Sequence, residues 1–165
     1  MAEVMDQELD LSRYGYVPGD KFVAYVSSYT RTGKKKVGIR VYDVDVEAGT
    51  LSEKSEISIT NSSYVTISHN GRFLYSITDF GVEAFKIVSG GNLEKINRGS
   101  INGMRGSHLS TDYNDEYLFV CSYHDGKITV LRLAKTEVSV RSRMSSSSRD
   151  WEALRSAISG RMCNA

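Results

Sequence analysis

The sequence lacks several features that would point to particular classes of protein. It has only two cysteines in 165 residues, Cys121 and Cys163. A disulfide framework is therefore not indicated, and a reduced cytoplasmic protein is the simpler interpretation. No apolar run approaches the roughly 20 residues that cross a bilayer. Residues 1–10 have neither the basic start nor the apolar centre of a signal peptide.

Charge of one sign is lacking as well. The chain carries 21 lysines and arginines against 20 aspartates and glutamates, a net charge of +1. No overall field therefore favours nucleic acid as a partner, and we expect neither nucleic acid nor a membrane to be bound.

A sustained apolar period of 3.6 residues is missing between residues 22 and 133. This stretch holds short apolar runs separated by turn signals, in a chain with ten tyrosines and five phenylalanines, which favour strands. Asn70-Gly71 lies between two such runs, and Asn-Gly in that setting is the strongest short signal for a hairpin. The expected strands cover 22–26, 37–44, 51–59, 64–68, 73–78 and 82–88, and another begins at Leu93.

These expected strands also repeat. Residues 63–75 align with 107–119 at an offset of 44 residues, and 38–42 (GIRVY) align with 81–85 (GVEAF) at an offset of 43. A period of roughly 40–45 residues with about four strands in each unit is typical of propeller blades. An antiparallel sandwich with evenly spaced strands is the alternative. The turn residues match as well as the apolar positions, which favours the propeller.

The segment after Leu133 has a different composition. It contains eight serines, four of them consecutive at 145–148, and six lysines and arginines against three acidic residues. The blade repeat is not continued, so 134–165 is predicted as a divergent tail, helical or disordered. A helix over 149–162 would place Trp151, Leu154 and Ile158 on one face. A frameshift or truncation of the gene explains such a change, and so does a genuine C-terminal tail. The expected division is 1–21, 22–133 and 134–165.

Six short phrases stand in a recognisable order: YVSSYT (25–30), GIRVY (38–42), NSSY (61–64), SHNGRFLY (68–75), SHLS (107–110) and SYHDG (122–126). Together they resemble the propeller-type lactonase family, seven-bladed β-propellers whose best-known activity is the hydrolysis of 6-phosphogluconolactone. The resemblance implies an all-β fold, here a partial propeller of about three four-stranded blades. It also implies a lactone hydrolase of the pentose phosphate pathway, with a sugar-phosphate lactone as its small-molecule partner.

The sequence departs from the family pattern in two ways. Ser62 and Gly106 stand where proline is common, Ser107 stands for cysteine and Ser122 for asparagine. A ring of seven blades at roughly 45 residues each needs over about 300 residues, so the later blades have no counterpart here. A truncated, non-catalytic fragment is thus one alternative to an enzyme. A binding module completed by oligomerisation is another, since exposed blade edges favour self-association.

Hydrolysis of a phosphorylated lactone needs a base, donors for the oxyanion and a group that holds the phosphate. The resemblance places a family histidine at His108, which is our candidate catalytic residue. Arg105, in the preceding loop, is the candidate for binding phosphate or carboxylate. Tyr29, Asp79 and Tyr123 each follow the second strand of their blade, so we expect them around the channel mouth, where they would bind substrate hydroxyls.

No metal or other cofactor is expected. Lactones are activated esters, and the three histidines show no metal-ligand spacing. His69 and His124 lie in turn sequences and are expected to serve those turns. The basic run at 34–36 is expected to be a solvated hairpin loop.

Overall fold

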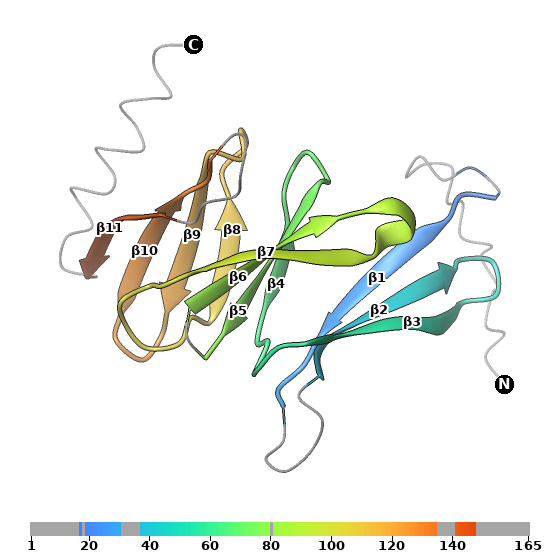
Figure 1. The fold of residues 1–165 in the computed structure, drawn as a ribbon, viewed down its shortest axis with the longest axis horizontal. Helices are drawn as coiled ribbons and strands as arrows, with labels where there is room; N and C mark the ends of the chain where they lie inside the picture. Colours follow the sequence, from blue (N-terminus) through green and yellow to red (C-terminus); the bar gives the residue numbers. More distant parts are fainter. Residues whose placement is uncertain (1–16, 18, 31–36, 80, 135–140, 148–165) are drawn as a thin grey trace, which may run out of the picture.

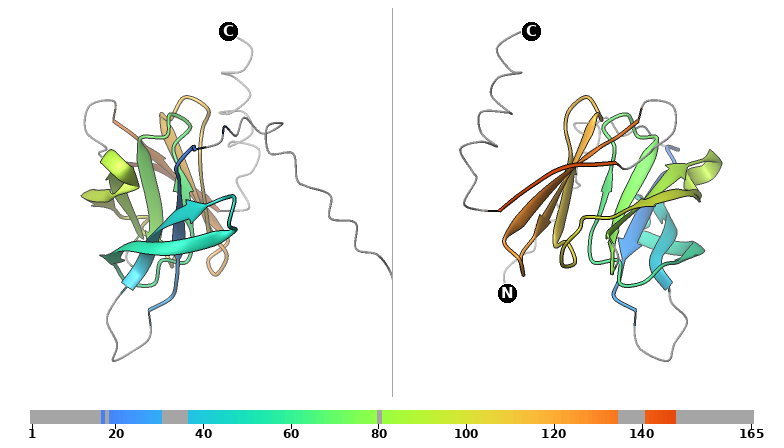
Figure 2. Two further views of the ribbon diagram at one scale, coloured as in Figure 1. Left: turned by 90° about the vertical axis from the view of Figure 1, so that its right-hand side faces the viewer. Right: turned by 60° about the vertical axis from the view of Figure 1, so that its left-hand side comes forward.

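Short apolar runs broken by turns fold into three antiparallel sheets, which stand side by side in Figure 1 and in the right-hand view of Figure 2. The structure is a computed structural model, and it describes residues 17, 19–30, 37–79, 81–134 and 141–147. Each sheet is a simple meander in which consecutive strands are neighbours.

We call the sheets blades 1, 2 and 3. Blade 1 contains β1 (Phe22–Ser27), β2 (Val37–Asp45) and β3 (Thr50–Ser58). Blade 2 contains β4 (Val65–Ile67), β5 (Phe73–Thr78), β6 (Gly81–Ile87) and β7 (Leu93–Gly99). Blade 3 contains β8 (His108–Thr111), β9 (Tyr117–Ser122), β10 (Lys127–Arg132) and β11 (Arg141–Ser147). A short 3-10 turn, η2 (Ser89–Gly91), joins β6 to β7.

The predicted all-β class and partial propeller are confirmed by these three blades. The Asn-Gly hairpin is found between β4 and β5, where Asn70 accepts hydrogen bonds from the hydroxyl of Ser68 and the amide of Arg72, both at 2.9 Å. Gly71 has a φ of +68°, a backbone conformation that glycine adopts without steric cost.

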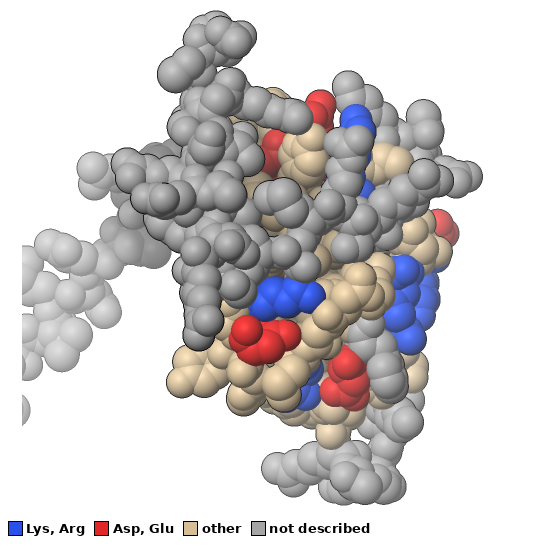
Figure 3. All heavy atoms as spheres, turned by 90° about the vertical axis from the view of Figure 1, so that its left-hand side faces the viewer, with Lys and Arg blue, Asp and Glu red and all other residues tan. Residues whose placement is uncertain are grey.

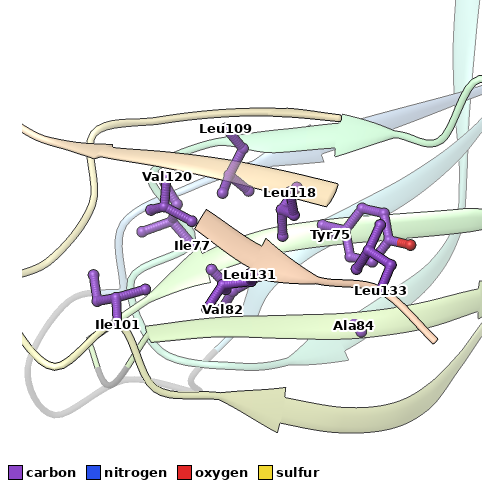
Figure 4. Close-up of a cluster of buried hydrophobic side chains, with 10 residues drawn as sticks. All are labelled: Tyr75, Ile77, Val82, Ala84, Ile101, Leu109, Leu118, Val120, Leu131 and Leu133. Carbon is purple, nitrogen blue, oxygen red and sulfur yellow. The ribbon is translucent and has the colours of Figure 1, made fainter. Parts of the chain in front are cut away.

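The main core lies between blades 2 and 3 (Figure 4). It is built mainly by the alternate residues of β5, β6, β8, β9 and β10 that face the space between the two sheets, with Ile101 and Leu133 added from outside the strands. Its members are Tyr75, Ile77, Val82, Ala84, Ile101, Leu109, Leu118, Val120, Leu131 and Leu133.

A smaller core lies between blades 1 and 2. Ile39, Ile59, Leu74 and Phe85 form its buried centre. Blade 2 thus lies between two others, and all but one residue of β5 are buried although β5 is only six residues long. Both faces of its central strands are covered, as in a stack of blades.

Strand β11 is the main difference from the sequence prediction, because it lies in the stretch expected to be a tail. It pairs antiparallel with β10, from Lys127 opposite Ser147 to Arg132 opposite Arg141, with an irregularity after Val130. The sequence RSRMSSS has no apolar alternation, so pairing along the backbone of β10 defines the strand. The helix expected at 149–162, residues 1–16 and the basic run at 34–36 lie outside the described residues.

The connections leave the blades at two ends. The strands of each meander alternate in direction, so the loops after β1, β5 and β9 leave at the same end as the crossings from blade to blade. We call this the crossover end; its described residues are 28–30, 59–64, 79, 100–107 and 123–126. In the described part of the chain, no helix is long and apolar enough to span a membrane.

Candidate substrate-binding site

Asp79 is the centre of a polar cluster at the crossover end. It follows β5 directly, and both of its carboxylate oxygens accept hydrogen bonds from Nδ2 of Asn61 at 2.9 Å. Nη1 of Arg105 lies 3.2 Å from Oδ1 of Asp79 and forms an ion pair with it. The two partners come from the two crossings between blades, 59–64 and 100–107, so the cluster connects all three blades.

Arg105 also contacts Tyr29. Its guanidinium carbon lies 4.9 Å from the centre of the Tyr29 ring, within the range of a cation–π contact. Asn61 in turn accepts a hydrogen bond from the amide of Thr30, the next residue after Tyr29, at 2.9 Å. Asn61 has a φ of 47°, a conformation that asparagine tolerates better than most residues. Tyr29, Asn61, Asp79 and Arg105 form one continuous network, which we call the Asp79 cluster.

The protonation of Asp79 follows from these contacts. Partial burial acts to raise the pKa of Asp79, but hydrogen bonds from Asn61, Thr60 and Arg105 and the charge of Arg105 act against it. Their combined effect is stronger, and the pKa lies below its ordinary value. Asp79 is therefore an anion at neutral pH and serves the cluster as an acceptor.

The loop that carries Arg105 is fixed to blade 3. Oδ2 of Asp125 accepts a hydrogen bond from the amide of Met104 at 3.0 Å. Nζ of Lys127 donates to the carbonyl oxygens of Ile101 at 3.0 Å and Asn102 at 2.7 Å. The Ser122 hydroxyl reaches the carbonyl oxygen of Arg105 itself at 3.2 Å. These contacts hold the backbone of the loop at Arg105, and the contacts with Asp79 and Tyr29 orient its side chain.

His108 is the first residue of β8 and is exposed. Its ring lies against that of Tyr64, with 4.6 Å between ring centres and a tilt of 48°. Tyr64 precedes β4, so it holds the same place in blade 2 that His108 holds in blade 3. The two rings thus lie side by side at the start of adjacent inner strands, and His108 is presented to solvent from a fixed position.

Tyr123 is not part of the Asp79 cluster. It lies at the crossover end on the loop after β9, its ring packs edge-on against His124 at 5.6 Å, and 83% of the residue is exposed. The structure thus brings Tyr29, Asp79 and Arg105 together and leaves His108 and Tyr123 as separate side chains at the same end. It adds Asn61 and Thr30, which belong to the phrases NSSY (61–64) and YVSSYT (25–30) but were not singled out as site residues.

His69 lies at the opposite end of the blades. Its Nδ1 is 3.1 Å from the hydroxyl of Thr111, and its amide and that of Asn70 both donate to Asp115 at 2.9 Å. A pocket of about 460 Å³ lies away from the Asp79 cluster, at the end of blade 1 where β1 begins, and is lined in part by Asp20, Asp43 and Lys54.

Metal-binding groups are not found in the parts of the chain that the structure describes: no three histidine, cysteine or acidic side chains gather in a way that could hold an ion. Cys121 is a free thiol.

The family comparison decides between a propeller and other stacks of sheets, because the model for "Lactonase, 7-bladed beta-propeller" matches residues 23–150. The chain belongs to this lactonase family. The match runs through β11, which agrees with the place of that strand in blade 3.

Two relatives within the lactonase family carry the name 6-phosphogluconolactonase. The Bacillus subtilis protein is 34% identical over 116 residues, which is 67% of this chain and 33% of that protein. The Formosa agariphila protein is 33% identical over 120 residues, covering 68% of this chain and 34% of that protein. The chain thus spans about a third of the length of the curated relatives that it matches.

Solved structures show the same fold as this lactonase-family chain. A proposed 6-phosphogluconolactonase from Bacteroides fragilis superimposes with a TM-score of 0.69 at 23% identity, covering 77% of this chain and 36% of that one. The periplasmic gluconolactonase of Pseudomonas aeruginosa gives a TM-score of 0.62 at 16% identity, covering 74% and 36%. At these identities the likeness supports the propeller fold alone.

Proposed function

We propose that this chain forms three blades of a lactone hydrolase that opens the ring of a phosphorylated sugar lactone such as 6-phosphogluconolactone. The observation that carries the proposal is the Asp79 cluster. Three blades contribute charged and hydrogen-bonding side chains to one end of the propeller, in a chain related to proteins named 6-phosphogluconolactonase. His108 and Tyr123 lie at the same end.

Arg105 is the proposed anchor for the phosphate. A guanidinium carries five N–H donors in a fixed fork, so the one that faces Asp79 leaves others to bind phosphate oxygens. The bonds from blade 3 hold the backbone of the 100–107 loop, and Asp79 and the ring of Tyr29 orient the guanidinium, which lowers the entropy lost on binding. The neighbouring Asp79 carboxylate offsets part of the positive charge, so hydrogen-bond geometry matters more here than net attraction.

Asp79, Tyr29 and Tyr123 are the proposed contacts for the sugar hydroxyls. Asp79 is ionised and accepts hydrogen bonds, which suits it to a hydroxyl donor. Tyr29 and Tyr123 are 62% and 83% exposed, so their phenol groups are accessible to a ligand at the crossover end.

His108 is the proposed general base. Its imidazole would take a proton from water while the water oxygen attacks the lactone carbonyl carbon. The ring C–O bond then breaks, and the proton passes to the released ring oxygen, which leaves a hydroxy acid. The contact with Tyr64 holds the imidazole at the start of β8, at the same end of the blades as Arg105. We place this reaction in the cytoplasm, where a reducing environment is compatible with the free thiol of Cys121.

Acid release from freshly prepared 6-phosphogluconolactone tests the reaction, measured against spontaneous hydrolysis in buffer. The purified chain should exceed the buffer rate, and His108→Ala should lower kcat on the order of 100-fold. Arg105→Ala should raise KM by roughly tenfold and weaken binding of 6-phosphogluconate in calorimetry. The matched control is His69→Gln at the opposite end, which should leave both measurements unchanged.

A binding module is the second candidate, favoured by the fact that the cluster forms within three blades while the chain spans only about a third of the length of its relatives. Calorimetry separates the two functions. Binding of 6-phosphogluconate that depends on Arg105, without any hydrolysis, supports the binding module and excludes the enzyme. If the chain shows neither binding nor hydrolysis, both proposed functions are wrong and a non-catalytic fragment is the remaining interpretation.

A further inference from the structure

The register of the strands defines equivalent positions in the three blades. Tyr25 pairs with Val41, Tyr75 with Ala84 and Phe119 with Val130. The last two pairs join the second and third strands of blades 2 and 3. In blade 1, where the structure describes three strands, β1 and β2 take the corresponding places. The pairs two residues further along the strands also correspond: Ser27 with Ile39, Ile77 with Val82 and Cys121 with Ile128. We call these four positions the leading face: Tyr25, Ser27, Ile39 and Val41 in blade 1; Tyr75, Ile77, Val82 and Ala84 in blade 2; Phe119, Cys121, Ile128 and Val130 in blade 3.

The leading face is where a blade packs on the next one. In blade 2 all four residues are at most 1% exposed, because they lie in the core shared with blade 3. In blade 3 the equivalent residues are also apolar, yet all four are only partly buried. None of the sheets in the described part of the chain packs on them. Blade 3 therefore presents an interface of the same type as blade 2.

The opposite face of each blade, which we call the trailing face, packs against the leading face of the preceding blade. Leu118, Val120 and Leu131 fill these positions in blade 3, and Leu74, Ser76 and Phe85 fill them in blade 2. In blade 1 the equivalent positions hold Ala24, Val26 and Tyr42. They are again mainly apolar, and Val26 is 44% exposed. The two outer faces of the chain therefore match the two halves of an interface that it already forms twice.

A charged triad on the trailing face supports this comparison. In blade 2 the buried Glu83 forms ion pairs with Lys95 at 2.9 Å and with Arg98. In blade 1 the same three positions hold Arg40, Glu53 and Glu56, with every sign reversed and both N–O distances at 3.6 Å.

The two triads differ chiefly in burial. The side chain of Glu83 is 2% exposed beneath blade 1, whereas that of Arg40 is 37% exposed. Blade 1 thus carries an internal type of ion-pair group on a face that no other sheet among the described residues covers.

We propose that the trailing face of blade 1 binds the leading face of blade 3 of a second copy of this chain, head to tail. A second copy is the occupant that offers the matching face at the matching strand positions. Charged groups of both signs are interspersed on the described part of the side that blade 3 turns outward (Figure 3), so no field of one sign opposes the contact. The interface is heterologous, so its repetition gives either a closed ring or an open chain of copies. This surface is separate from the Asp79 cluster.

The contact between blades 2 and 3 shows which residues would meet between copies. Ile77 and Val120 lie together in that core (Figure 4), and a Cβ added to Gly106 would be 3.2 Å from the first and 2.8 Å from the second. Their equivalents on the outer faces are Cys121 and Val26. The proposal therefore predicts that Cys121 of one copy faces Val26 of the next.

Disulfide trapping tests this contact directly. Val26→Cys is made together with Cys163→Ser, so that Cys121 is the single native thiol, and two thiols are joined by added oxidised glutathione. We expect a species of at least twice 18.4 kDa that disappears on reduction and in the further variant Cys121→Ser. Ser52→Cys is the matched control, because Ser52 is an exposed residue of β3 opposite Asp43, on the other face of the blade. It should give at least tenfold less of the cross-linked species.

Sedimentation of the unmodified chain provides a second measurement that needs no cysteine variant. The weight-average mass should rise with concentration, and Val130→Lys, on the leading face of blade 3, should shift the chain to monomer. A monomer at all concentrations, with no more trapping at position 26 than at position 52, would overturn the proposal. That result would mean that a segment of the same chain covers these faces or that they stay open.

Discussion

Arg105 lies 3.2 Å from Asp79, although the first residue belongs to the crossing into blade 3 and the second directly follows β5 of blade 2. The same carboxylate is held by Asn61 from the crossing into blade 2. One acidic side chain therefore links both crossings at the end of the molecule where we place the substrate. Its contribution to stability and its pH dependence follow from the same contacts.

Asp79→Asn should lower stability at neutral pH and lower it less in acid. The pKa of Asp79 is below its ordinary 3.8, so the folded state favours the anion, and this stabilisation is complete above the unfolded value. It is lost as the pH falls through the lowered pKa. Because the group is a third exposed, we expect only about 0.5 kcal/mol at pH 7. Urea unfolding at pH 7 and pH 3 measures it; an equal difference at both pH values would contradict the assignment.

Tyr25→Phe should weaken the contact between blades 1 and 2. The phenol donates a 2.7 Å hydrogen bond to the carbonyl oxygen of Gly91, 66 residues away. Burial raises the pKa of Tyr25, so the donor stays protonated. Loss of one such bond costs about 1 kcal/mol. Thermal unfolding provides the measurement, and Tyr123→Phe, on an exposed loop, is the control. Equal stability of the two variants would exclude a role for the Tyr25 bond.

Gly81→Ala should be far more costly than Gly49→Ala, although both positions have positive φ, 128° and 64°. A Cβ at Gly81 would collide with the carbonyl oxygen of Gly99 in β7, whereas nothing lies within 4 Å of one at Gly49. We expect a loss of roughly 3 kcal/mol at position 81 against about 1 kcal/mol at position 49. Denaturant unfolding midpoints of the two variants measure this difference. Similar losses of stability at positions 81 and 49 would show that backbone strain, and not the collision with Gly99, determines the cost.

Glu83→Gln should destabilise blade 2 by roughly 1–2 kcal/mol, since Lys95 and Arg98 would keep a neutral partner in place of a buried carboxylate. The two cations are about half exposed and can turn to water, which limits the loss. The sign-reversed triad of blade 1 suggests a rescue by Glu83→Arg with Lys95→Glu and Arg98→Glu. Urea unfolding compares the two proteins. A triple variant less stable than Glu83→Gln would show that the two sites are not equivalent.

The sequence was sufficient to predict blades 1 to 3 because turn signals and apolar runs recur together. The Asn70-Gly71 turn and the 43-residue offset between β2 and β6 are local or repeated features. Strand β11 was missed because its serines and arginines carry no apolar pattern. At Gly106, where family members commonly have proline, the structure gives a physical reason for glycine: a Cβ would lie 2.8 Å from Val120.

The site was only partly predictable. Tyr29 and Asp79 were found because they follow strands that occupy corresponding places in the repeat, β1 in blade 1 and β5 in blade 2. The same reasoning selected Tyr123, which lies against His124 instead. Asn61 was missed as a site residue, because its role depends on a loop conformation with a φ of 47° and on a contact with Asp79 18 residues away. Contacts between crossings of different blades leave no periodic signal.

Backbone amide shifts of the isotope-labelled chain, followed by NMR during titration with 6-phosphogluconate, test the central claim most directly. If three blades present a binding cluster at the crossover end, the shifts that move should gather at Tyr29, Asp79, Arg105 and His108. Those near His69 and Asp115 at the opposite end should stay in place. Shift changes that gather at the opposite end would contradict the account. So would the absence of any shift change at millimolar ligand.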